Sequence, residues 1–277
     1  MDVAAYLERI GYRGRVTATL ETLRQIHARH PAAIAFENLD AFSGSTASLE
    51  IESIEQKLVA GGRGGWCFEH NLLLSSVLRE LGFDVRELAA RVLWNAPESV
   101  TRPRTHMVLL VTAEAQRYLV DVGFGGLTLT APLRFEADIE QTTPHERFRM
   151  LETGDEFLLQ AAVQEGWKSL YRFDLQPQTC ADYELTNWYL SNHPDSHFRS
   201  HLVVARPAVD RRYALLDDQL TVYYTDGDSE RRTLADVAEL RAVLTEIFLL
   251  RLGDVLTLER TLQRVFQPGE QVSLGKQ

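Results

Sequence analysis

A glycine-rich stretch leads into a cysteine whose position suits a nucleophile. The stretch runs from Gly61 to Cys67 with the sequence GGRGGWC. The segment 72–81 that follows has apolar residues at helical spacing and stops at Gly82, so we expect Cys67 in the first turn of a helix. The free N–H groups and the positive end of the helix dipole there favour a thiolate over a thiol. The alternative is a tight turn in which Cys67 is a small buried hydrophobic residue.

A hairpin further along the chain supplies a possible base for this cysteine. Two apolar runs, 106–111 and 118–122, are separated by a short polar break that fits a hairpin turn. Paired residue numbers in an antiparallel hairpin have a constant sum, so a turn centred near residues 113–114 places His106 opposite Asp121. The carboxylate would fix the imidazole tautomer and stabilise an imidazolium beside the thiol. The alternative is that His106 ends a strand and Asp121 forms a turn.

Cys67, His106 and Asp121 together form a candidate Cys-His-Asp triad, the thiol counterpart of the serine-protease arrangement. For a His–Asp pair alone the structural alternative would be preferred. The observation that favours a catalytic role is the cysteine at the start of a helix, directly after a glycine-rich stretch.

The remaining polar residues are assigned no chemistry. His70, one helical turn after Cys67, is expected to pack against its helix or solvate it, and His27 and His30 are expected on a solvated helix surface. Cys180 is expected to be structural, in a polar loop. A further polar group resembles a metal site by composition only, because its spacing matches no ligand signature, so we expect a surface loop and no metal. The group comprises Asp182, His193, Asp195, His197 and His201.

The elements that must position these residues divide into a helical part and a mainly β part. Amphipathic stripes predict helices over about 3–10, 20–30, 53–60 and 67–81, whereas 34–40 is predicted as a loop or turn. Strand patterns follow at 85–94, in the hairpin, and at 157–159, 170–173 and 220–224, before a helix near 234–252. The sequence therefore predicts an α+β fold whose regions divide approximately near residues 84 and 195.

Composition narrows the class of protein. The 277 residues, 45% hydrophobic and 25% charged, are typical of a soluble globular protein. A net charge of −10 argues against nucleic acid or an anionic membrane as the main partner. Two distant cysteines form neither a disulfide framework nor a zinc motif, which favours a reduced, cytoplasmic setting. No signal peptide and no apolar run of transmembrane length is visible.

Several motifs resemble those of the arylamine N-acetyltransferase family. They are RGGWCFEHN at 63–71, FENLD at 36–40, RTH at 104–106, DVGFGGLT at 121–128, and the run 187–199. The resemblance covers about residues 1–200 and is greatest to enterobacterial-type members, which include N-hydroxyarylamine O-acetyltransferases. This chain departs from the usual family pattern at Ala35, where Pro is common, at Trp66, where Tyr is common, and at His70, which is often apolar.

The resemblance implies a fold and a reaction. Cys67 resembles the acetylated nucleophile, His106 the base and Asp121 the residue that orients it, arranged as in cysteine proteinases. Three regions are implied: a helical bundle over 1–84, a β-barrel over 85–195 and an α/β lid over 196–277. Acetyl-CoA would be the cosubstrate, with no metal, and the acetyl group would pass through a cysteine thioester to an arylamine, an arylhydrazine or an N-hydroxyarylamine.

Two sets of residues are candidates for binding these substrates. Phe36, Trp66, Phe124 and Phe198 are candidates for an aromatic acceptor pocket, and their alternative role is core packing. Gly125, Gly126 and Thr128 are candidates for CoA contacts.

Other functions and assembly states stay open. The alternative enzymes are a Cys-His-Asp hydrolase and a transglutaminase-like acyl transferase, and a protein of another class would only bind aromatic ligands. The sequence identifies neither the physiological acceptor nor the oligomeric state, and a homo-oligomer is compatible with it.

Overall fold

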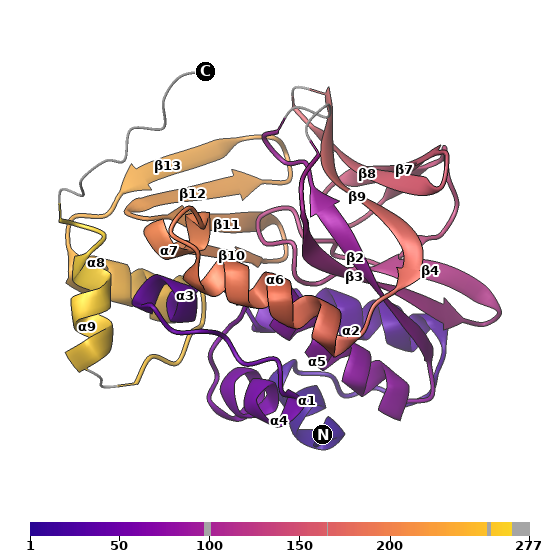
Figure 1. The fold of residues 1–277 in the computed structure, drawn as a ribbon, viewed down its shortest axis with the longest axis horizontal. Helices are drawn as coiled ribbons and strands as arrows, with labels where there is room; N and C mark the ends of the chain where they lie inside the picture. The colour runs from indigo at the N-terminus through magenta and orange to yellow at the C-terminus, as the bar shows by residue number, and fades with distance from the viewer. Residues whose placement is uncertain (97–100, 165, 254–255, 268–277) are drawn as a thin grey trace.

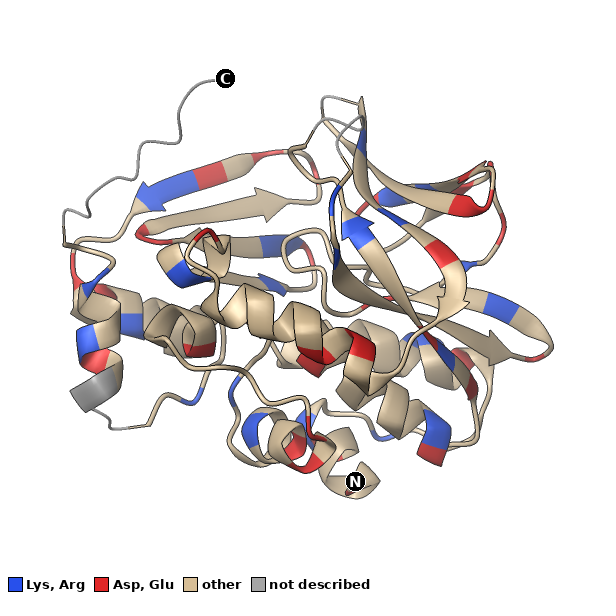
Figure 2. Ribbon diagram, in the orientation of Figure 1, with Lys and Arg blue, Asp and Glu red and all other residues tan. Residues whose placement is uncertain are grey.

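Two antiparallel sheets, with helices packed around them, form the fold (Figure 1). The computed structural model describes residues 1–96, 101–164, 166–253 and 256–267. The larger sheet has the strand order β5-β4-β3-β2-β9-β8-β7-β6, and the smaller has the order β1-β10-β11-β12-β13. The predicted α+β class is confirmed. Figure 2 shows basic and acidic positions interspersed along the helices and both sheets.

The helices of the first eighty residues fall where the amphipathic stripes predict them. The segment 34–40 is the exception, because it holds a two-residue strand and the start of a short helix rather than a loop. A strand of two residues is too short to show a period of two, so sequence reasoning missed it. The helical elements are α1 Val3–Arg9, α2 Leu20–Ala33, α3 Leu39–Ser43, α4 Ile51–Ile54, the π-helix η1 Glu55–Ala60, α5 Cys67–Glu80, α6 Cys180–Asn192, α7 His197–Ser200, α8 Val237–Ala242, the π-helix η2 Val243–Ile247 and α9 Leu256–Gln263.

The larger sheet nearly closes into a barrel. The side chain of Gln141 on β6 bonds to the backbone N–H and C=O of Arg134 on β5, at 2.8 and 2.9 Å. Since β5 and β6 are the two ends of the strand order, this contact joins the edges of the sheet. Its strands are β2 Asp84–Val92, β3 Arg104–Ala113, β4 Gln116–Val120, β5 Leu133–Arg134, β6 Glu140–Thr142, β7 Arg147–Thr153, β8 Glu156–Val163 and β9 Gly166–Pro177.

The smaller sheet joins the two ends of the chain. Strand β1 pairs with β10 through Phe36 and Ala205, so an N-terminal segment extends a sheet of C-terminal strands. Leu215 and Leu220 on one face of this sheet share a buried cluster with Leu244 and Phe248. The division into three regions at residues 84 and 195 stays a prediction. The strands of this sheet are β1 Phe36–Glu37, β10 Val203–Pro207, β11 Arg211–Leu216, β12 Gln219–Tyr224 and β13 Ser229–Thr233.

The hairpin of β3 and β4 has a register that differs by two residues from the predicted one. Its turn lies at Glu114 and Ala115, which both have positive φ as in a type I′ turn. Leu109 therefore pairs with Val120, and His106 does not lie directly opposite Asp121. Because side chains alternate with a period of two, a shift of two residues keeps both side chains on one face. The predicted neighbours meet diagonally instead.

Three histidines form part of the interior. The prediction that His27 and His30 lie on a solvated surface is wrong, because both are fully buried, as is His70 on α5. On α2 they continue the helical stripe of Leu23 and Ile26, which faces the core. Each ring has a hydrogen-bond partner inside the protein, which makes its burial tolerable.

Acidification is expected to destabilise the fold steeply between about pH 6.5 and pH 4. Burial lowers the pKa of His27 and of His70 to about 4, and that of His30 well below its ordinary value. The folded protein thus keeps the rings neutral while the unfolded chain binds protons, so stability present at pH 7 is lost as the pH falls. Each ring contributes about 2 kcal/mol of this loss between pH 7 and pH 5.

Denaturant unfolding at pH 7, 6 and 5 measures this effect. We expect the three rings together to remove about 5 kcal/mol of the free energy of unfolding by pH 5. His106 acts in the opposite direction, because its raised pKa keeps the folded ring protonated while the unfolded ring takes up its proton only as the pH falls through about 6.5; it offsets about 1 kcal/mol of this loss. A free energy of unfolding that stays constant from pH 7 to pH 5 would contradict the burial of these rings as neutral groups.

Candidate active site

The first turn of α5 brings Cys67 beside His106 of β3 and Asp121, which directly follows β4. The Nε2 atom of His106 lies 2.7 Å from Oδ2 of Asp121, and the same ring bonds to the thiol of Cys67. With Nε2 engaged by the carboxylate, Nδ1 is the nitrogen left to face the sulfur. The Sγ atom of Cys67 also lies 3.7 Å from the carbonyl oxygen of Thr105. The structure thus brings the three predicted residues together.

The charges of this group are stabilised within a buried site. Burial alone would lower the pKa of His106, but the charge and hydrogen bond of Asp121, together with the contact to Cys67, raise it to about 10. Burial would raise the pKa of Asp121, yet His106 and the donors around the carboxylate hold it below its usual value. The imidazolium–carboxylate pair is therefore the stable form at neutral pH.

The carboxylate of Asp121 is fixed by donors on its other oxygen. Its Oδ1 accepts from the backbone N–H of Gly123 at 2.9 Å and from the side-chain amide of Asn71 at 3.1 Å. Asn71 also donates to the carbonyl of Met107 at 2.8 Å. Asn71 follows Cys67 by four residues and so lies on the same face of α5. Sequence reasoning missed Asn71, although this helical spacing from the cysteine was the available signal.

The four predicted aromatic residues divide into two clusters. The ring of Phe198 lies 5.7 Å from Trp66 and 6.1 Å from Phe36. Phe124 lies instead 5.2 Å from His106 and 5.3 Å from Tyr171. Trp66 precedes Cys67 and Phe124 contacts His106, so both clusters border the triad.

Tyr171 on β9 is an aromatic neighbour of the triad that sequence reasoning missed. Its ring centroid lies 5.1 Å from that of His106, and its side chain is fully buried. The pairing of β9 with β2 brings it here, since Tyr171 pairs with Val92. The sequence pattern predicted a strand at 170–173 but carried no information on its partner.

An ion-pair network holds the glycine-rich approach to Cys67. The Nζ atom of Lys57 lies 2.7 Å from Glu69 and 2.6 Å from Asp40, and Arg63 lies 2.7 Å from Glu37. The second carboxylate oxygen of Glu69 accepts the backbone N–H of the residue before Cys67 at 3.1 Å, which satisfies a donor at the helix start. Sequence reasoning gave these charges no role, because helical and strand periods do not show which segments meet.

Comparison with known proteins identifies the family. The model of the N-acetyltransferase family matches residues 19–256. Arylamine N-acetyltransferase of Escherichia coli is 44% identical over 250 residues, which cover 90% of this chain and 89% of that protein. The chain belongs to the arylamine N-acetyltransferase family. It is an enzyme of the acyltransferase class, as the resemblance of its motifs implied.

Two further relatives extend the comparison. The Salmonella typhimurium protein named arylamine N-acetyltransferase / N-hydroxyarylamine O-acetyltransferase is 40% identical over 252 residues, covering 91% of this chain and 89% of that protein. The structure of Mycobacterium marinum arylamine N-acetyltransferase in complex with CoA superposes with a TM-score of 0.91. It is 41% identical and covers 95% of this chain and 99% of that one.

The loop after Asp121 holds the three residues predicted to contact CoA. Gly125 has φ of +83°, and the ring of Phe36 limits the space that a side chain could occupy there. A side chain at Gly126 would meet nothing within 4 Å. Thr128 is buried, and its hydroxyl donates to the carbonyl of Asp121 at 3.1 Å. The Thr128 carbonyl accepts from the guanidinium of Arg212 on β11 at 3.0 Å. The loop is therefore tied to the triad on one side and to the smaller sheet on the other.

Replacing Gly123 by Ala is expected to lower acetyl transfer about 10²-fold, because a misplacement near 1 Å costs about this much. A Cβ atom at this position would lie 2.7 Å from Cα of Cys67 and 3.0 Å from its carbonyl oxygen. These are backbone atoms that cannot rotate away, so α5 and the Asp121 loop must separate. Steady-state kinetics measures the loss.

Gly154→Ala is the matched control. Gly154 lies in the turn between β7 and β8, has φ of +63°, and would have open space for a Cβ atom. The substitution strains the backbone without contacting Cys67, so we expect lower stability with unchanged kcat/KM. Wild-type activity in Gly123→Ala would contradict the close packing of this loop on the cysteine.

The polar group considered as a metal site lies on α6, on α7 and in the residues beside them. In the ranges that the structure describes, no three His, Cys, Asp or Glu side chains are grouped so that they could hold a metal ion. His201 bonds to Asp217 at 2.6 Å, and the ring of His197 stacks on the ring of His201.

Cys180 is exposed and begins α6, so its predicted place in a loop is wrong. None of the described helices is long and apolar enough to cross a membrane.

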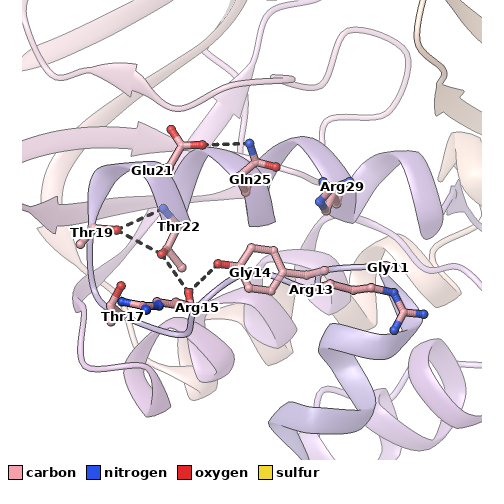
Figure 3. A pocket seen from close by; sticks show the side chains of 11 residues that line it. Gly11, Arg13, Gly14, Arg15, Thr17, Thr19, Glu21, Thr22, Gln25 and Arg29 are labelled. Carbon is pink, nitrogen blue, oxygen red and sulfur yellow. Dashed lines mark hydrogen bonds between the residues drawn. The ribbon is translucent and has the colours of Figure 1, made fainter.

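A separate cavity of about 570 Å³ lies between the loop that joins α1 to α2 and the first turns of α2 (Figure 3). Some of its polar side chains bond to neighbours: Gln25 to Glu21 and Thr22 to the carbonyl of Arg15. It shares no lining residue with the triad or its aromatic neighbours, so it is not part of this site.

Proposed function

We propose that the protein transfers an acetyl group from acetyl-CoA to arylamines, arylhydrazines or N-hydroxyarylamines through a thioester on Cys67. The observation that carries the proposal is the His106–Asp121 pair, 2.7 Å apart and buried beside a cysteine at the start of α5. An imidazolium–thiolate pair at a helix N-terminus is suited to attack on an acyl carbon.

The first half-reaction forms the thioester. The Cys67 thiolate attacks the acetyl carbonyl, and the backbone N–H of Cys67 with a neighbouring N–H stabilises the oxyanion. The carbon–sulfur bond to CoA then breaks, and the His106 imidazolium donates its proton to the departing CoA thiolate. The products are free CoA, acetylated Cys67 and a neutral His106 that is held by Asp121.

The second half-reaction consumes the thioester. The nitrogen or oxygen of the acceptor attacks the acetyl carbon while the neutral His106 removes the acceptor proton. The thiolate of Cys67 leaves, and the imidazolium–thiolate pair is restored. Asp121 keeps Nε2 of the ring protonated in both halves, so Nδ1 always faces the reacting atoms.

The relatives support the choice of substrates. A CoA complex of the Mycobacterium marinum enzyme supports a CoA thioester as donor, and the name of the Salmonella relative supports hydroxylamine acceptors beside amines. We propose that the two aromatic clusters form the acceptor pocket, with Phe36, Trp66 and Phe198 on one side and Phe124 on the other. Gly125, Gly126 and Thr128 are proposed to contact CoA.

Release of CoA, followed in time with and without acceptor, tests this function. With acetyl-CoA alone we expect a burst of one CoA per chain and then little further release. Addition of aniline, phenylhydrazine or N-phenylhydroxylamine should start steady turnover. Continuous release without acceptor would indicate a hydrolase, and no release at all would indicate a protein that only binds.

A further inference from the structure

A chain of buried hydrogen bonds crosses the helices behind the nucleophile. The hydroxyl of Tyr6 on α1 lies 2.8 Å from Nδ1 of His30 on α2. The Nε2 atom of His30 lies 2.9 Å from Nδ1 of His70 on α5, and Nε2 of His70 lies 3.2 Å from the carbonyl oxygen of Ala35. All three side chains are fully buried. The proposed mechanism uses none of them.

The chain has one consistent direction. The Ala35 carbonyl only accepts, so Nε2 of His70 must carry a proton and donate it. Burial keeps the rings neutral, so Nδ1 of His70 accepts from Nε2 of His30, and Nδ1 of His30 accepts from the hydroxyl of Tyr6. Every donor along the chain therefore has an acceptor, and the chain ends at the backbone of Gly65 and at the carbonyl of Ala35.

That carbonyl lies between the proposed acceptor pocket and the approach to Cys67. It also accepts the backbone N–H of Gly65 at 3.3 Å, and the carbonyl of Gly65 accepts from Glu37 at 2.8 Å. These two bonds form a parallel bridge between Phe36 and Gly65. Phe36, the residue after Ala35, packs its ring against Phe198. A movement of the Ala35 peptide would therefore move an aromatic side chain of the pocket.

We propose that His70 is a positioning residue for the acceptor half of the reaction. Its hydrogen bond, oriented by His30 and Tyr6, holds the Ala35 peptide against Gly65 and so fixes the ring of Phe36. This inference rests on the proposed function, because it takes Phe36 as part of the acceptor pocket. The chain of bonds ends at the backbone before Cys67 and includes neither His106 nor Asp121, so thioester formation should depend on it less than the acceptor half does.

Kinetics of the two half-reactions test the proposal. In a ping-pong scheme kcat/KM for acetyl-CoA reports only the first half, and kcat/KM for aniline reports only the second. His70→Leu should lower the value for aniline about threefold to tenfold, as expected for one lost buried hydrogen bond, and change the value for acetyl-CoA by less than about twofold. Tyr6→Phe removes only the distant hydroxyl and should lower the value for aniline about twofold to threefold.

Two further variants separate positioning from general stability. His70→Gln keeps an N–H that can reach Ala35, so it should restore most of the value for aniline. Ser75→Ala is the matched control, since Ser75 is buried on the same helix and donates to Glu87 at 2.6 Å, away from this chain of bonds. It should lower the thermal midpoint without changing either kinetic value. If His70→Leu does not fold, Tyr6→Phe carries the test.

Two results would overturn the proposal. One is an unchanged value for aniline in Tyr6→Phe and His70→Leu. The other is a parallel fall of both kinetic values in proportion to lost stability. A wild-type protein that releases no burst of CoA would instead contradict the proposed function on which the inference rests, so the two failures can be told apart.

Discussion

Replacing Cys67 by Ser is expected to lower acetyl transfer by about 10⁴-fold or more, the usual scale for loss of a covalent nucleophile. The site is arranged for a sulfur anion next to a cation. The charge and hydrogen bond of Asp121 still raise the pKa of His106 in this variant, so the ring tends to hold its proton at neutral pH and is a poor base for a serine hydroxyl. A hydroxyl at this position would remain neutral and a poor nucleophile.

The second cysteine supplies the control for this variant. Cys180→Ser changes the same atom at the exposed start of α6, and we expect wild-type turnover from it. Acetyl transfer is measured as CoA release with aniline present. Residual activity above a tenth in Cys67→Ser, or a large loss in Cys180→Ser, would contradict the assignment of the nucleophile.

Replacing Asp121 by Asn is expected to lower kcat/KM by about 10³- to 10⁴-fold. The Oδ1 position of Asp121 is surrounded by donors from Gly123 and Asn71, so an asparagine would place its carbonyl there and its NH₂ toward His106. The ring would then have to accept at Nε2 and carry its proton on Nδ1, which is the wrong tautomer for attack by the thiol. Loss of the carboxylate charge also leaves burial free to lower the pKa of His106.

A surface pair of the same kind provides the matched control. Asp217 lies 2.6 Å from Nδ1 of His201 on a partly exposed site, so Asp217→Asn removes a similar His–Asp contact away from the triad. We expect Asp217→Asn to keep wild-type kcat/KM. The pH profiles of both variants, with thermal midpoints as a check on folding, measure the difference. More than a tenth of wild-type activity in Asp121→Asn would contradict the role of the carboxylate.

Local signals in the sequence were enough to predict that Cys67, His106 and Asp121 lie together. The start of α5 at Cys67 follows from the glycine-rich stretch and the apolar spacing after it, which need no knowledge of the rest of the fold. The hairpin was placed two residues out of register, because the two-residue turn at Glu114 and Ala115 was centred too early. The prediction still identified the neighbours, since an even shift preserves the face of the strand.

Contacts between distant segments account for what the sequence did not show. The pairing of Phe36 with Ala205 and of Val92 with Tyr171 depends on how whole sheets are ordered, and no local period encodes that order. The polar end of the helix that holds His27 and His30 favours a solvated surface for both. Their positions on the apolar stripe of α2 indicated burial, and only their partners in the folded protein explain why burial is tolerated.

Mass spectrometry of the protein mixed with acetyl-CoA alone tests the central claim most directly. The intact mass should show one acetyl group per chain, peptide mapping should place it on Cys67, and addition of an arylamine should remove it. An unmodified Cys67 in a folded protein with intact acetyl-CoA, or a stable acetyl group on any other residue alone, would contradict transfer through a Cys67 thioester.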